Sequence, residues 1–205
     1  MHLAHVLPVF AGLTSALVVQ PRQSQPTGVQ ITQLAYSGNG CTASSAAGPA
    51  LTDVTTWTVP MKIYKAESGA NNTRVAETKV NCQQSFTVTH PAGWQFSVNK
   101  ADYYGRVQLG QGAEAISTTT YSFTGDAKTL SSRYYFDGPF SGLYFRNDRY
   151  TAATGLWSKC GTGATLNINT EVKVGPLSGG STRPASMEAF NPYGGKIGVA
   201  WRKCT

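Results

Sequence analysis

Charged residues are scarce in this 205-residue sequence: 17 Lys and Arg and 10 Asp and Glu make up only 13% of it, against about 25% in an average globular domain. Apolar residues make up 40% and aromatic residues 11%, enough for a hydrophobic core, which excludes a disordered polyelectrolyte. A coiled coil is excluded too, because Ala, Glu, Lys, Leu and Arg make up only 56 of the 205 residues, against about half in such proteins. The composition is typical of a β protein.

Histidine is also scarce, with three copies, and two of them lie in an apolar N-terminal stretch. Residues 3–19 carry no formal charge and include the small-residue sequence 14–16, so we expect residues 1–16 to be a secretory signal peptide that is removed. A membrane anchor would need about 18 unbroken apolar residues, and Pro8 and Gln20 count against it. We therefore predict a secreted, extracellular protein without a membrane span.

Removal of that segment leaves His90 as the one histidine of the mature chain. A single histidine cannot supply the clusters of zinc sites, and no cofactor or metal site is predicted. His90 stands between Thr89 and Pro91, where we expect an exposed turn residue rather than a catalytic base. Neither a catalytic triad nor a catalytic metal is therefore expected.

Cysteine occurs four times, at Cys41, Cys82, Cys160 and Cys204. The four are tens of residues apart, unlike the closely spaced ligand pairs of structural zinc sites, so we expect two disulfides in a secreted chain. Four cysteines allow three pairings. Sequential pairing would close two loops and stabilise the fold by about 4 kcal/mol each in the chain-entropy model.

The chain is predicted to hold one domain, residues 29–205, after a short flexible segment, residues 17–28. A pro-segment ending at Arg22 is an alternative within that segment. Asn71 begins the standard glycosylation sequon of the chain, Asn-Asn-Thr, and lies in a Gly/Asn-rich turn where a glycan could be added. The hypothesis of a glycoprotein depends on this site.

Hydrophobic side chains alternate with polar ones in short segments almost throughout, which predicts β-strands. A hairpin is expected around the turn at residues 91–93, and the stretch 175–193 is expected to be a surface loop with one helical turn at Ala185 to Phe190. No helical apolar stripe persists for three turns. We predict an all-β fold, a single antiparallel β-sandwich, jelly-roll-like or a partly closed barrel. The expected strands are Val29–Tyr36, Trp57–Ile63, Cys82–Val88, Trp94–Val98, Tyr103–Leu109, Ala115–Phe123, Leu166–Val174 and Ile197–Trp201.

Carboxylate-pair chemistry on glycosidic bonds needs only two acidic groups about 5 to 10 Å apart. Ten scattered acids make such a pair a weak signal, and solvated turn carboxylates are the favoured interpretation. The candidates for this alternative are Asp102, Asp137, Asp148 and Glu171.

The formal net charge of +7 and the sequence pI of about 9.3 favour acidic partners. Nucleic acid is not expected among them, because no Lys/Arg run exceeds Arg202-Lys203 and no RNA- or DNA-binding signature is present. Residues 133–150 interleave arginines with aromatic rings, which is compatible with sugar stacking or protein contacts. The alternative is a core strand with every second ring inside. The residues of the candidate binding surface are Tyr134, Tyr144, Arg146, Arg149 and Tyr150.

Eight fragments in the same order resemble one family of small secreted proteins of filamentous fungi that is classed only as a domain of unknown function. The resemblance covers the chain from about residue 29 and implies an all-β domain with Cys41 paired to Cys82 and Cys160 to Cys204. It carries over no catalytic residue, and the stretch 179–193 departs from the family pattern. The fragments are YSGNGC (36–41), NC (81–82), PAGWQFSV (91–98), YYG (103–105), GP (138–139), WSKCG (157–161), LNINT (166–170) and WRKC (201–204).

The functional prediction is a secreted, monomeric, non-enzymatic binding or interaction module, acting as an effector or as a binder of cell-wall or host components. Its expected partners are an extracellular polysaccharide or a host, apoplastic protein. The alternative is a carbohydrate-active enzyme that uses a carboxylate pair. A membrane-active toxin is disfavoured by the lack of an amphipathic helix.

Overall fold

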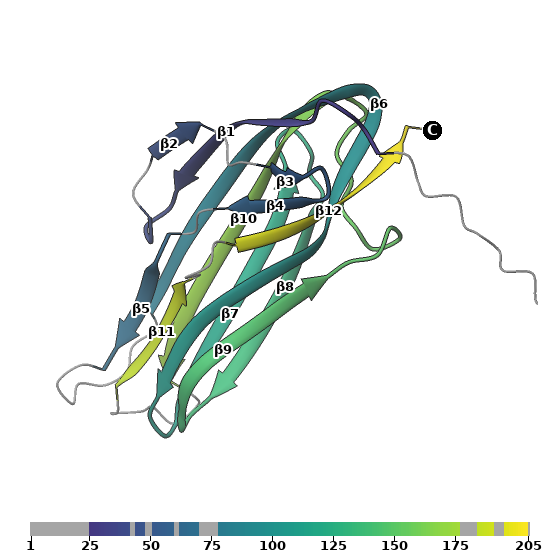
Figure 1. Ribbon diagram of the computed structural model, residues 1–205. Helices are drawn as coiled ribbons and strands as arrows, with labels where there is room; N and C mark the ends of the chain where they lie inside the picture. Colours follow the sequence, from purple (N-terminus) through teal and green to yellow (C-terminus); the bar gives the residue numbers. More distant parts are fainter. Residues whose placement is uncertain are drawn as a thin grey trace, which may run out of the picture.

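The computed structural model describes residues 25–41, 44–47, 51–59, 62–69, 78–176, 184–190 and 195–204, and every regular element in them is a β-strand (Figure 1). All strand pairings are antiparallel. The prediction of an all-β, antiparallel fold is therefore confirmed. The strands are β1 (Gln30–Ser37), β2 (Ser44–Ala47), β3 (Leu51–Asp53), β4 (Thr56–Val59), β5 (Tyr64–Ser68), β6 (Thr78–Leu109), β7 (Ala113–Phe123), β8 (Thr129–Asp137), β9 (Phe140–Arg149), β10 (Gly161–Pro176), β11 (Ala185–Phe190) and β12 (Gly195–Lys203).

Strand β6 is 32 residues long and belongs to both layers of a sandwich. It bends near residues 90–93, at the top of Figure 1, where Pro91 has no N–H to donate and Gly93 has a φ of +79°. Layer 1 consists of β2, β1, the first half of β6 (residues 78–89), β10, β7 and β8. Layer 2 consists of β3, β4, β12, the second half of β6 (residues 94–109) and β9, with β11 and β5 extending it beside β12.

The hairpin expected around residues 91–93 is wrong, because the two halves of β6 do not pair with each other. The first half pairs with β1 and β10 and the second with β12, β11 and β9. Pro91 and Gly93 do change the direction of the chain, but the strand continues over the edge of the sandwich into the other layer.

The same bend buries His90, which is 5% exposed and packs edge-on against Phe96 and Trp201 at centroid distances of 5.9 and 5.4 Å. The expectation of an exposed turn residue is therefore wrong as well.

The core lies between the two layers and is filled by the inward-facing side chains, which are every second residue along the strands. Every second residue of β7 and of the central part of β10 is buried, and so are Trp57 of β4 and Phe86 and Phe96 of β6. The Phe96 ring stands edge-on to Phe123 of the opposite layer at 5.1 Å. These rings join layer 1 to layer 2.

The outer face of layer 1 is a flat array of amide and hydroxyl side chains. Ser85 donates to Asn167 Oδ1 at 2.7 Å, and Asn81 Nδ2 donates to Asn169 Oδ1 at 2.9 Å. Each of these pairs joins β6 to the neighbouring β10. This face is polar because side chains alternate along each strand, so that one side of the sheet packs on the core and the other faces the solvent.

Two disulfides join distant segments, in the pairing that the family resemblance implies. Cys41, just after β1, is bonded to Cys82 in β6. Cys160, just before β10, is bonded to Cys204 at the end of β12. Each disulfide ties a chain segment of about 40 residues to the sandwich, which restricts the unfolded chain more than the folded one.

The helical turn expected at Ala185 to Phe190 is wrong: these residues form β11, which pairs with both β5 and β6. Ala185, Met187 and Ala189 are buried, and this period of two is that of a strand. Their small or flexible side chains let β11 lie against layer 1. Residues 1–24, with the expected signal peptide, and Asn71 lie outside the described residues. Within the described part, no helix is long and apolar enough to cross a membrane.

Candidate functional site

The residues of the predicted binding surface do not share one face: Tyr134 lies on β8 of layer 1, and β9, with Tyr150 directly after it, places the others on the two faces of layer 2. Tyr144 and Arg146 point inward and are 8% and 1% exposed, so these two follow the core alternative that the sequence left open. Tyr134 and Tyr150 are half-buried, and Arg149 is exposed. The structure therefore brings only Arg149 and Tyr150 to one accessible place, the end of β9.

Arg146 is held inside the sandwich by neighbours from both layers. Its guanidinium donates hydrogen bonds to the backbone oxygen of Ser117 at 3.1 Å, to the Ser117 hydroxyl at 2.9 Å and to the Thr119 hydroxyl. The aromatic rings of Tyr103 and Tyr134 lie against it, with centroids at 4.4 and 4.9 Å. A cation with this many neighbours has a structural role and is not available to a ligand.

Asp148 is the buried counter-charge of Arg146. Its Oδ1 lies 3.5 Å from Arg146 Nε, while its Oδ2 accepts hydrogen bonds from Tyr121 at 2.8 Å and Ser132 at 2.7 Å. Burial, followed by the nearby Tyr103 and Asp148, raises the pKa of Tyr121 well above its ordinary value. Tyr121 therefore remains a neutral donor to the carboxylate, while Arg146 Nε and Asp148 Oδ1 face each other as an ion pair without a hydrogen bond.

The other candidate carboxylates do not form a facing pair with Asp148. Asp102 points to the outer face of layer 2, where Lys100 lies 3.1 Å away and Asn147 donates to it. Glu171 is paired with Lys79 at 2.9 Å on the outer face of layer 1, and Asp137 is exposed at the end of β8. Asp102 and Asp148 thus lie on opposite faces of layer 2.

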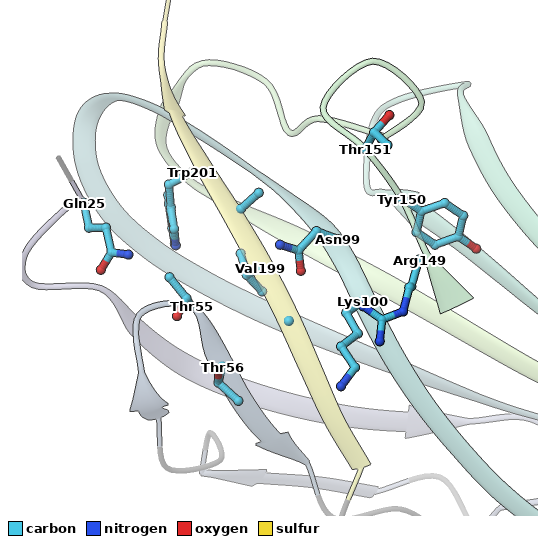
Figure 2. Close-up of a pocket in the computed structure, with 12 residues that line it drawn as sticks. Gln25, Thr55, Thr56, Asn99, Lys100, Arg149, Tyr150, Thr151, Val199 and Trp201 are labelled. Atoms are coloured by element: carbon cyan, nitrogen blue, oxygen red, sulfur yellow. The ribbon is translucent and has the colours of Figure 1, made fainter. Parts of the chain in front are cut away.

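An open groove of about 700 Å³ crosses β12 between β4 and the end of β9. Figure 2 shows its two walls on either side of the β12 ribbon, with Thr55 and Thr56 on one side and Asn99, Lys100 and Arg149 on the other. None of the described residues that line it is acidic. They are Gln25, Thr55, Thr56, Asn99, Lys100, Arg149, Tyr150, Thr151, Gly198, Val199, Ala200 and Trp201.

The groove exists because β12 and β6 pair irregularly at this point. Gly198 pairs with Lys100 but Val199 pairs with Val98, so Asn99 is an extra residue in the ladder, a β-bulge. Bulges re-aim side chains. Gly198 has no side chain to fill the space: a Cβ there would lie 2.5 Å from the Asn99 side-chain oxygen. A larger residue at this position would close the groove.

Two cations stand side by side in the wall of the groove. Lys100 and Arg149 are directly opposite each other in the ladder of β6 and β9, an arrangement of like charges that destabilises a sheet. Asp102 balances Lys100, whereas Arg149 has no ion pair within the described ranges. The fold therefore keeps an uncompensated positive charge at the groove. The Tyr150 ring points away from these cations and stands edge-on to the core residue Tyr121 with centroids 5.5 Å apart, and burial raises the pKa of the Tyr150 hydroxyl.

Sequence reasoning found Arg149 and Tyr150 but missed Lys100, Asn99 and Gly198. Arg149 and Tyr150 lie in a segment dense in arginines and rings, which drew attention to it. Asn99 and Lys100 belong to no cluster of basic or aromatic residues. Gly198 interrupts a strand pattern, which can indicate a bulge, but nothing near it in the sequence shows which residues the bulge brings together.

A family model described as a domain of unknown function, DUF4360, matches residues 27–204. The chain belongs to this family. It is 29% identical over 185 residues to an uncharacterized secreted protein of Arthroderma benhamiae, an alignment that covers 88% of this chain and 74% of that one. Among solved structures, TmCBM61, determined in complex with β-1,4-galactotriose, is similar at 11% identity with a TM-score of 0.32, over 85% of this chain and 90% of that one.

This member of the DUF4360 family is a secreted protein. The Arthroderma relative is described as secreted, and the two disulfides fit an oxidising, extracellular environment. The localisation predicted from the sequence is confirmed.

Proposed function

We propose that the protein is a non-enzymatic extracellular binding protein that holds an acidic polysaccharide in the groove across β12. The observation that carries the proposal is the pair Lys100 and Arg149, two adjacent cations in a groove whose described lining contains no acid. Like charges held together at a cost to the fold are best explained by a negatively charged ligand. Sugar carboxylates would supply that charge outside the cell.

The remaining lining groups suit the hydroxyls of a sugar chain. Asn99 offers an amide that can both donate and accept, and Thr55, Thr56 and Thr151 offer hydroxyls. Because the groove is open along its length rather than closed like a small-molecule pocket, a chain could pass through it.

Carboxylate-pair catalysis is not supported by the groove. Cleavage of a glycosidic bond by that route needs two acids placed across the bond. The two acids that touch groove-lining residues are both engaged, Asp53 by the backbone N–H and hydroxyl of Thr55 and Asp102 by Lys100 and Asn147. Asp148 is buried on the other side of the same layer. Binding without hydrolysis is therefore the function that these residues favour.

A direct test compares binding to polygalacturonate with binding to the same polymer after methyl esterification, which keeps the chain and removes its charge. We expect the purified protein to bind the free acid and to release it as salt is raised, because salt screens exposed charges. Arg149→Gln is expected to lower the affinity about fivefold or more at low salt.

The matched control is Arg133→Gln, which removes another exposed arginine, on the outer face of layer 1, and should bind like the wild type. Equal binding to the charged and the esterified polymer would contradict the proposal. So would an Arg149→Gln variant that binds like the wild type.

A further inference from the structure

Large apolar side chains are exposed on the outer face of layer 2, beyond the groove. Leu143 and Phe145 of β9 are 66% and 58% exposed. The Phe145 ring packs against Tyr104 of β6 with centroids 4.8 Å apart and planes inclined by 42°. Tyr104, Leu143 and Phe145 lie next to one another on this face and form an apolar surface, which we call the ring platform.

The ring platform and the groove lie on the same two strands and the same face. The ladder of β6 and β9 alternates, so every second pair points outward, and the platform pair comes four residues after the groove pair along β6. At about 3.3 Å per residue this is a separation of about 13 Å. The outward pairs, in order, are Lys100 with Arg149, Asp102 with Asn147, Tyr104 with Phe145, and Arg106 with Leu143.

The fold does not need these side chains where they are. Tyr144, the residue between Leu143 and Phe145, points inward and is packed in the core at 8% exposure. Its two outward neighbours leave a large part of their apolar surface in water, and adjacent exposed apolar groups on a soluble protein mark interaction sites. A sugar ring presents apolar C–H groups on its faces, which a flat aromatic surface can cover.

We infer that the ring platform is a second subsite for the same acidic polysaccharide, so that the outer face of layer 2 holds an extended chain by its charge at one end and by ring stacking at the other. The inference rests on the proposed function of the groove. It adds that recognition spans several sugar residues and depends on chain length, which the groove alone would not require.

A second copy of this chain is the competing occupant of the platform, and the charges disfavour it. A symmetric contact on this face would bring together Lys100, Arg106 and Arg149 of each copy against only Asp102 and Glu188. Facing surfaces with an excess of the same charge repel each other. A polyanion has no such cost on this face.

The test measures affinities for galacturonate oligomers of increasing length and for the polymer, with the full-length secreted protein. We expect the affinity of the wild type to rise with length until the chain reaches both subsites. Phe145→Ala is expected to weaken polymer binding about tenfold and to leave the binding of short oligomers unchanged. Arg149→Gln should weaken both.

The matched control is Tyr135→Ala, because Tyr135 is 63% exposed on the outer face of layer 1 and its loss should change nothing. Near-ultraviolet circular dichroism verifies that each variant is folded. If Phe145→Ala binds the polymer like the wild type while Arg149→Gln does not, the platform inference is wrong and the groove proposal stands. If the wild type binds no acidic chain, both are wrong.

Sedimentation of the wild type and of Phe145→Ala tests whether a second copy of the chain, and not a polysaccharide, occupies the ring platform. A wild type that dimerises, together with a monomeric Phe145→Ala, would show that the platform is a contact between copies and would overturn the inference. A monomer in both cases is the expected result.

Discussion

Between Leu143 and Asp148 of β9 two charged side chains lie inside and two large apolar ones lie outside, the reverse of the usual pattern. Leu143 and Phe145 are exposed while Arg146 and Asp148 are buried. A rule that places hydrophobic residues inside would have chosen the opposite face. The inward direction is fixed by the register with β6, where Tyr103 must point into the core. Sequence alone could therefore name the residues of this segment but not the face on which each lies.

The buried charge pair gives a prediction about stability. Arg146→Met is expected to lower the free energy of unfolding by about 3 to 5 kcal/mol, because it leaves Asp148 buried without a counter-charge. Equilibrium urea unfolding measures the loss. The contrasting variant is Lys65→Met, which breaks the exposed ion pair with Glu67 and should cost at most about 1 kcal/mol. Equal losses in the two variants would contradict the interpretation.

At the scale of the strand, β6 determines how the sandwich is built. Its alternating pattern was predicted correctly from the sequence, but residues 91–93, which were predicted to be a turn between two strands, are a bend within one continuous strand. Whether a turn sends a strand back along its own edge or over into another layer depends on what pairs beside it. The neighbours here are β1, β10 and β12, which are distant in sequence, so local pattern could not distinguish a hairpin from a bend.

A close approach within β6 gives a second prediction. At Gly105 a Cβ would lie 2.2 Å from the backbone oxygen of Glu188 in β11 and 2.2 Å from the Tyr144 ring. Gly105→Ala must therefore displace β11 or the ring, and we expect a loss of about 2 kcal/mol or more in unfolding free energy.

The matched control for this prediction is Gly142→Ala in the neighbouring strand β9. There an added Cβ would meet only the Phe140 ring, at 3.7 Å, an ordinary contact. Thermal unfolding should show a clear loss for Gly105→Ala and little change for Gly142→Ala. A Gly105→Ala protein as stable as the wild type would mean that β11 is not held closely against β6.

At the scale of the whole molecule, composition, the cysteine count and the apolar N-terminal stretch were enough to predict the class, the presence of two disulfides and the compartment. They were not enough to predict the groove. Its walls come from the turn before β4, the middle of β6, the end of β9 and β12, four segments that only the finished sandwich brings together. A site assembled in this way has no motif in the sequence.

Several tyrosines buried in the core make the stability of the molecule sensitive to alkaline pH. Burial raises the pKa of Tyr144 to about 12, and the pKa values of Tyr64, Tyr103 and Tyr121 are raised further, also chiefly by burial. In the unfolded chain these hydroxyls ionise near pH 10. Their contribution to stability is therefore complete below pH 10 and is lost as the pH rises above it.

We expect the unfolding free energy to fall above pH 10 by about 1.4 kcal/mol per pH unit for each such tyrosine. Urea unfolding at a series of pH values between 8 and 11 measures the slope. Tyr144→Phe should reduce this slope by the contribution of one tyrosine, about 1.4 kcal/mol per pH unit. A stability that stays constant across this range would show that these hydroxyls ionise as readily in the folded protein as in the unfolded one.

The two outer faces of the sandwich differ in charge, and this sets how the protein would settle on an acidic matrix. The strands of layer 1 balance their outward charges, whereas those of layer 2 carry an excess of cations. When layer 2 lies against the matrix, the outer face of layer 1, with its amide and hydroxyl side chains, is turned toward the solvent. That face has balanced charges and therefore does not attract a further acidic chain. The protein would thus cover such a surface as a single layer and would not cross-link it. The outward charges are Lys79, Arg133, Lys173, Glu114, Asp137 and Glu171 on layer 1, and Lys100, Arg106, Arg149, Lys196, Arg202, Asp102 and Glu188 on β6, β9, β11 and β12 of layer 2.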